Sequence, residues 1–147
     1  MNTDTSLNVH VARHFDAPPE RVFDAWLDPE QAGRFLFATP TGQMVRVEID
    51  ARPGGKFAFV DRRDGEDIAH TGEYLEIDRP RRLVFTFRVE KYSSDSTRVI
   101  IEIVPMRSGS ELTLTHETHP DWAQYRDRTE AGWRSILDTL DTLLKSH

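Results

Sequence analysis

The sequence predicts an α+β domain in which a curved antiparallel sheet packs against one long C-terminal helix. Two observations near the chain ends support this: residues 13–29 have the pattern of a strand that runs directly into a helix, and residues 132–144 carry one helical apolar stripe. Between them, apolar residues recur at every second position, which is typical of strands with one buried face. The 147 residues suffice for one core, so we expect a single domain over 1–147, with residues 1–6 disordered.

The N-terminal segment is expected to form one strand and two short helices. Apolar and polar residues alternate over 7–15, which predicts the first strand. We expect Asp16 to cap the helix that follows, because its side chain can accept a hydrogen bond from the first turn. Pro29 is placed to start a second short helix, and Gly33 with Pro40 marks the loop that ends it.

The rest of the chain is expected to be a run of hairpins followed by the long helix. The strands are predicted at 44–49, 57–60, 68–77, 83–89, 99–103 and 112–116. The turn signals that separate them lie at 52–55, 62–66, 78–82 and 107–110, and 93–96 is expected to be the most flexible loop. Consecutive hairpins imply an antiparallel sheet of about six to seven strands, whose inner face the C-terminal helix must cover. That helix is expected to start at 119–121.

Composition excludes several classes of function. The absence of cysteine removes disulfides and thiolate metal sites, and the net charge of -6 argues against general binding of nucleic acid. We find no signal-peptide pattern and no apolar run long enough to cross a bilayer, so we expect a cytoplasmic protein without stable membrane insertion. Charged edge strands favour a monomer or a weak dimer.

Strand parity brings a set of aromatic side chains to the inner face of the sheet. Phe57, Phe59, Phe85 and Phe87 share this parity, and Trp133 lies on the helix opposite them. Any one of these rings alone is most simply explained as core. As a set, they favour an apolar pocket with few polar groups.

His116 is the sharpest candidate for chemistry, because it follows Leu112 and Leu114 on the inward face of the last strand. It could be a hydrogen-bonded core residue, a polar anchor for a ligand hydroxyl or carboxylate, or an acid–base group. Together with His70, His119 and Asp121 it does not form a convincing metal site, because a metal ion needs three or four convergent donors.

Arg13 shares the inward parity of the first strand. A buried guanidinium must be paired or must reach the mouth of a cavity, because an unpaired buried charge is too costly. Glu73 could be its partner, or Arg13 could sit at the edge of the sheet.

Several motifs, each weak alone, resemble one known family in their order and spacing. They are Phe15–Pro18, Val22–Trp26, Asp28–Pro29, Pro53–Gly55, Gly72–Ile77, Arg82–Phe85, Leu112–Glu117 and Gly132–Trp133. Over about Val9 to Leu144 the chain resembles the START-like (SRPBCC) superfamily, in its activator-of-heat-shock-ATPase-like branch. The resemblance implies a helix-grip fold, in which two short helices follow strand 1 and the curved sheet wraps the C-terminal helix around an apolar cavity.

The superfamily holds lipids, sterols, polyketides or plant hormones in this cavity, so the resemblance implies binding of a small hydrophobic ligand without a cofactor. The residues expected to line the site are Arg13, Trp26, Phe35, Phe37, Phe57, Phe59, Tyr74, Phe85, Phe87, His116 and Trp133. The branch usually has two tryptophans and a Gly-Pro turn where this chain has residues 34–40, so the ligand of a relative does not transfer.

Two alternatives remain beside the binding function. One is an enzyme resembling polyketide cyclases or dehydratases, with His116 as acid–base group and an inward Arg or Glu orienting the substrate. The other is a co-chaperone that stimulates a heat-shock ATPase, which only the name of the branch suggests. It is the least favoured, because the eukaryotic co-chaperone has an additional domain that we do not find in this chain.

Overall fold

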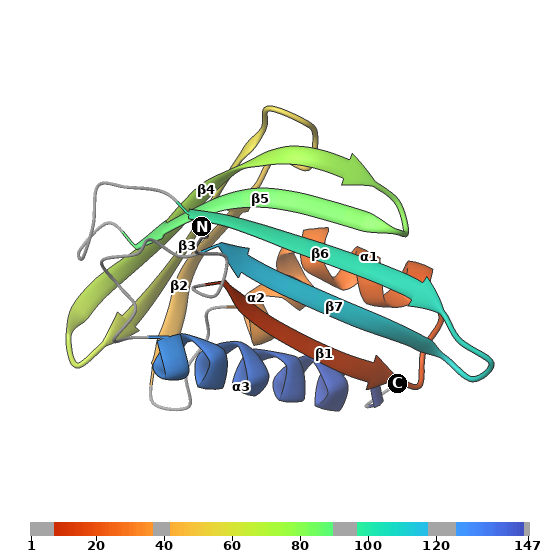
Figure 1. Cartoon of the computed structure of the whole chain (residues 1–147). Coiled ribbons are helices and arrows are strands. Elements are labelled where there is room, and N and C mark those ends of the chain that lie inside the picture. The colour runs from red at the N-terminus through yellow and green to blue at the C-terminus, as the bar shows by residue number, and fades with distance from the viewer. Residues whose placement is uncertain (1–7, 37–41, 90–96, 118–125, 146–147) are drawn as a thin grey trace, which may run out of the picture.

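The computed structural model describes residues 8–36, 42–89, 97–117 and 126–145. Strand β1 (Val9–Phe15) leads into helices α1 (Pro19–Leu27) and α2 (Pro29–Phe35). The remaining elements are β2 (Gln43–Ile49), β3 (Lys56–Arg63), β4 (Glu66–Asp78), β5 (Arg82–Val89), β6 (Thr97–Pro105), β7 (Ser110–Glu117) and α3 (Arg126–Lys145) (Figure 1). The expected disordered N-terminus, the loop at 93–96 and the helix start at 119–121 lie outside the described residues.

The strands form one antiparallel sheet in the order β1-β7-β6-β5-β4-β3-β2. The sheet curves over the helices, with α3 running along the β1 edge (Figure 1). Helix α3 packs against β1 and α2, whereas α1 packs against β6 and β7, and α2 against β2. The predicted helix-grip architecture is therefore confirmed, with one refinement: α1 and α2 share with α3 the task of covering the inner face.

Proline and aspartate determine how the N-terminal helices begin. The expected Asp16 cap is wrong, because Pro18 occupies the N-cap position of α1 with extended backbone and offers no side-chain hydrogen bond. Asp28, which was not predicted as a cap, caps α2 by accepting a hydrogen bond from the Glu30 backbone N–H at 3.1 Å. Helix α2 also continues through Gly33, where a Cβ would lie 3.0 Å from Val47 of β2.

The hairpin between β3 and β4 is tighter than its turn signal suggested. Asp64 and Gly65 both have positive φ values, 54° and 80°, which is the geometry of a two-residue type I′ turn. The strands therefore extend to Arg63 on one side and from Glu66 on the other.

Gly72 allows close packing at the centre of the inner face. A Cβ at this position would lie 1.9 Å from the Thr86 carbonyl oxygen and 2.5 Å from Cζ of Phe57. Phe57 is on β3 directly opposite Gly72, so its ring covers the space that a side chain would otherwise occupy.

Candidate functional site

A small cavity lies between the helices and the inner face of the sheet. Its lining residues come from α1, the end of α2 and strands β3 to β5: Trp26, Leu36, Phe57, Phe59, Tyr74, Leu83 and Phe85. We call this set the aromatic cavity. Its volume of about 10 Å³ accommodates about one water molecule.

The rings of the aromatic cavity contact one another in tilted or edge-to-face geometry. The Phe57 ring centroid lies 5.8 Å from that of Phe59, 5.4 Å from that of Tyr74 and 5.5 Å from that of Phe85. Trp26 packs edge-to-face on Phe35, with centroids 5.2 Å apart. Five residues expected from the sequence to line a site therefore lie around one cavity, and Phe35 supports it from behind Trp26.

Two polar groups belong to this otherwise apolar wall. The indole Nε1 of Trp26 is buried and has no hydrogen-bond acceptor among the described residues. Tyr74 contributes a phenol whose pKa is raised by burial and by the nearby Asp50 carboxylate, so this hydroxyl stays neutral.

His116 belongs to a separate, fully connected network. The Trp133 indole Nε1–H donates to His116 Nδ1 at 3.0 Å, and His116 Nε2 lies 2.6 Å from the Thr97 hydroxyl. An indole can only donate, so Nδ1 must be the acceptor and Nε2 must carry the proton. Thr97 in turn donates to the Phe87 carbonyl at 3.3 Å, which completes a directed chain of three hydrogen bonds.

The environment of His116 keeps its ring neutral and hydrogen-bonded within the protein. Burial lowers its pKa from 6.5 to about 4, although Glu117 acts in the opposite direction, so the ring is neutral at pH 7. Both ring nitrogens are engaged within the protein, and neither is directed to a ligand. Of the alternatives left open by the sequence, this geometry matches a hydrogen-bonded core histidine.

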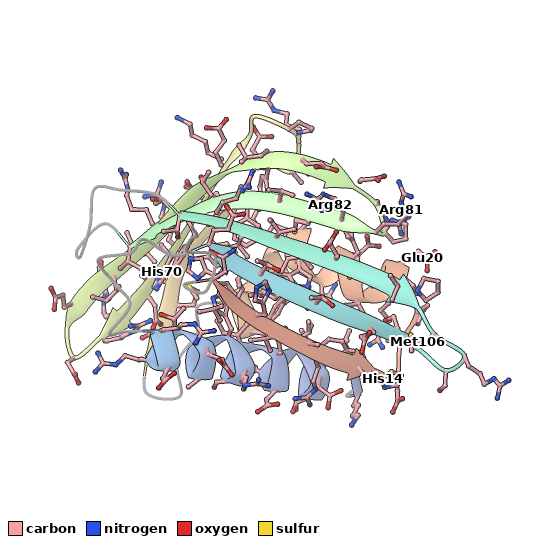
Figure 2. The ribbon with its side chains drawn as sticks, viewed as in Figure 1. His14, Glu20, His70, Arg81, Arg82 and Met106 are labelled. Atoms are coloured by element: carbon pink, nitrogen blue, oxygen red, sulfur yellow. The ribbon has the colours of Figure 1, made fainter. Side chains whose placement is uncertain are left out.

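His70 is a second buried histidine, which the sequence analysis considered only as a metal ligand. Its ring stacks on Phe87, with centroids 6.0 Å apart and planes 7° apart, and Phe87 also contacts His116 and Trp133. Burial, helped by the Arg63 guanidinium, lowers the pKa of His70 to about 4. Figure 2 shows His70 at the opposite end of the sheet from His14 and Met106.

Asp61 is a further inner-face residue that sequence reasoning missed. It is 1% exposed and accepts a hydrogen bond from Arg63 Nε at 2.6 Å. Parity was the signal that could have found both polar residues: Asp61 continues the row of Phe57 and Phe59, and His70 lies opposite Phe59.

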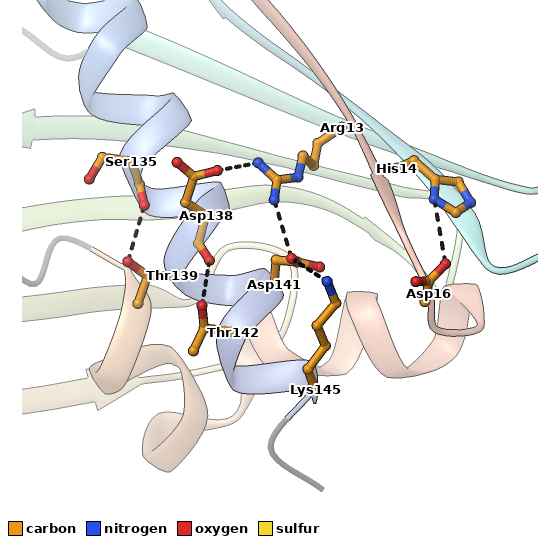
Figure 3. Close-up of polar contacts among 9 residues, drawn as sticks. All are labelled: Arg13, His14, Asp16, Ser135, Asp138, Thr139, Asp141, Thr142 and Lys145. Atoms are coloured by element: carbon orange, nitrogen blue, oxygen red, sulfur yellow. Dashed lines mark hydrogen bonds and ion pairs between the residues drawn. The ribbon is translucent and has the colours of Figure 1, made fainter.

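Arg13 lies on the edge strand β1, outside the aromatic cavity and outside the hydrogen-bond network of His116. Its position opposite buried Leu112 confirms the predicted inward parity. The suggested partner Glu73 is wrong, because the guanidinium forms ion pairs with Asp138 and Asp141 of α3 (Figure 3). It thereby ties the edge strand to the helix.

Three of the residues considered from the sequence, Phe37, His119 and Asp121, lie outside the described part of the chain. Within the described ranges, no group of three His, Cys, Asp or Glu side chains is arranged to hold a metal ion. No helix in those ranges is long and apolar enough to cross a membrane.

A curved antiparallel sheet that grips a C-terminal helix, with two short helices after its first strand, defines the helix-grip class of START-like proteins. Within that class, the chain belongs to the family described as "Activator of Hsp90 ATPase homolog 1-like protein", whose sequence model matches residues 16–145. Proteins with this fold commonly bind hydrophobic ligands.

Solved structures support the same fold. Protein CV1439 from Chromobacterium violaceum is similar with 29% sequence identity and a TM-score of 0.82, over 92% of this chain and 96% of that one. Protein NE0264 from Nitrosomonas europaea has 22% identity and a TM-score of 0.83, over 99% of both chains. An AHSA1-like protein from Aeromonas hydrophila has 22% identity and a TM-score of 0.81, over 95% and 92%. No curated protein matches this chain.

Proposed function

We propose that this protein binds a small apolar or aromatic molecule in the aromatic cavity, between the sheet and helix α1. The observation that carries the proposal is the composition of the wall: seven side chains, all apolar or aromatic, converge from both layers on one small cavity. Small-molecule sites are usually of this kind, with apolar walls and few polar groups.

The cavity must open for a ligand to enter. Its volume of about 10 Å³ is far below the several hundred Å³ of a typical small-molecule site. Strands β3, β4 and β5 are hydrogen-bonded on both sides, so the sheet side of the wall is stiff. The helical side, which supplies Trp26 and Leu36, is therefore the side that moves, and part of the binding free energy is spent on opening it.

The structure bears on one of the two alternative functions, the enzyme, and not on the other, the co-chaperone. The enzyme alternative requires a free nitrogen on His116, and the network with Trp133 and Thr97 engages both. The co-chaperone alternative stays a prediction, to be checked by testing whether the protein pulls down a chaperone ATPase at physiological salt.

Titration with cumene, a compact aromatic hydrocarbon, tests the proposal. We expect cumene to bind the wild type and to bind Leu36→Ala more tightly, because that variant enlarges the cavity from its movable side. Leu75→Ala is the control, because Leu75 is 46% exposed on the other face of the sheet. The affinity of this variant for cumene should equal that of the wild type. Calorimetry and the rise in unfolding temperature with ligand concentration would both report binding.

Absence of binding to both the wild type and Leu36→Ala, up to the solubility limit of cumene, would count against the proposal. Equal gains in Leu36→Ala and Leu75→Ala would show that the probe binds elsewhere. Native mass spectrometry of freshly purified protein would show independently whether an apolar molecule copurifies.

A further inference from the structure

One buried hydrogen-bond donor, on a residue that lines the aromatic cavity, is not used by the described part of the protein. Trp26 is 1% exposed, and its Nε1–H has no acceptor among the described residues. A buried donor without an acceptor is costly, and native proteins contain only a few. Such a group calls for an explanation.

The two buried indoles that the structure describes differ in this respect. Trp133 donates to His116 at 3.0 Å, so its N–H is used within the protein. Trp26 instead meets Phe35 edge-to-face, a geometry that provides at most a weak N–H···π contact. The two tryptophans therefore act as an unsatisfied and a satisfied donor within one molecule.

The surroundings of Trp26 restrict what could accept its proton. The cavity wall carries no charged side chain, so a carboxylate or phosphate would be buried without a counter-charge. Tyr74 lines the same space as a neutral phenol, because burial raises its pKa. A neutral oxygen, such as that of a ketone, ester or ether, satisfies the indole without this cost.

We infer that the Trp26 indole N–H is the polar anchor of the site, and that the ligand is an apolar or aromatic molecule carrying a neutral oxygen acceptor. This inference rests on the proposed function, because it assigns the ligand class of the same cavity. It makes Trp26 the specificity-determining residue, whereas the remaining wall supplies apolar contact and the neutral phenol of Tyr74.

Acetophenone and cumene test this inference, since they have nearly the same shape and differ in one carbonyl oxygen. Both are titrated into the wild type and into Trp26→Phe, which removes the N–H and keeps an aromatic ring. The ratio of the two affinities cancels changes in cavity size. We expect the preference for acetophenone to fall by about 3- to 10-fold in Trp26→Phe, the size of one net hydrogen bond.

The indole N–H signals in a proton–nitrogen correlation spectrum provide the second readout. Loss of one signal in Trp26→Phe and of another in Trp133→Phe assigns the two peaks. Acetophenone should move the Trp26 signal downfield and cumene should not, while the Trp133 signal stays in place as an internal control.

The outcomes separate the inference from the function on which it rests. If neither compound binds the wild type or Leu36→Ala, the proposed function and the inference both fail. If both compounds bind and the affinity ratio is the same in Trp26→Phe, the function stands and the inference is wrong. A Trp26 signal that is already downfield without ligand, and does not respond to acetophenone, would assign the N–H to an internal acceptor such as water and overturn the inference.

Discussion

The pKa values of the two buried histidines predict how the stability of the fold depends on pH. Burial holds His70 and His116 at a pKa of about 4, against 6.5 for an ordinary histidine. Between these values the unfolded chain binds more protons than the folded chain, so stability falls as the pH falls. The contribution of each ring is fully present above pH 6.5 and is lost progressively towards pH 4. From pH 7 to pH 5, each histidine should lower the free energy of unfolding by about 2 kcal/mol.

Replacing one of the two histidines isolates its contribution to the pH dependence of stability. The variant His116→Asn keeps an oxygen that can accept from Trp133 but has no titrating group, so the loss of stability between pH 7 and 5 should shrink by about 2 kcal/mol. Urea denaturation of the variant and of the wild type at several pH values measures how the free energy of unfolding depends on pH. The difference between the two proteins is the contribution of His116, because their other titrating groups are the same. Leu137→Ala is the control, because this fully buried residue lowers stability without removing a proton site.

Two results would refute this reasoning. One is a His116→Asn variant whose pH slope matches that of the wild type and of Leu137→Ala. The other is a His116 pKa near 6.5 measured directly by NMR titration of the folded protein, which would show that the ring is hydrated rather than sealed by its network.

Three further predictions concern packing and charge. Gly72→Ala should lower the free energy of unfolding, measured by urea denaturation, by about 3 kcal/mol, because the added Cβ would lie 1.9 Å from a backbone oxygen. Gly132→Ala should instead raise the free energy of unfolding by about 0.5–1 kcal/mol, because its Cβ would have no atom within 4 Å. Arg63→Met should lower the free energy of unfolding by about 3 kcal/mol, because the buried Asp61 carboxylate loses its partner at 2.6 Å. The double variant Arg63→Met with Asp61→Leu should recover most of this loss. Equal losses in the single and the double variant would contradict the prediction. Arg13→Met should lower the free energy of unfolding by about 1 kcal/mol, and by less in 1 M salt, because Arg13 is 34% exposed and its partner Asp138 is 65% exposed, while Asp141 is more buried. A loss that does not depend on salt would argue for packing instead.

Much of the fold could be predicted because it depends on local periodicity. Alternation of apolar residues located every strand, and the turn signal at 62–66 located the hairpin in which Asp64 and Gly65 adopt positive φ values. Predicted strands such as 57–60 were too short, because Asp61 is a polar residue on the buried face and breaks the apolar pattern. The cap of α1 was wrong because proline geometry at Pro18 overrides the side-chain preference of Asp16.

The sequence predicted some of the residues that surround the cavity, whereas the dimensions of the cavity could not be predicted. Parity brought Phe57, Phe59 and Phe85 to one face, and the cavity lies between them. Its volume depends on how rings from separate strands pack at the ångström level, which no alternation pattern encodes. The partners of Arg13 lie on α3, more than one hundred positions later in the chain, so local reasoning proposed Glu73 instead.

The pairing of the first and last strands has a consequence for how the protein is made. His10 of β1 and Thr115 of β7 touch across the sheet, although 105 positions of sequence separate them. A ribosome adds about 5–20 residues per second, so β1 emerges roughly 5–20 s before its partner strand exists. During that interval Val9, Val11 and Phe15, all buried in the finished protein, have no strand to pair with. The first strand to be synthesised therefore cannot pair until the last strand exists, and early chain termination leaves its apolar residues without their partner strand.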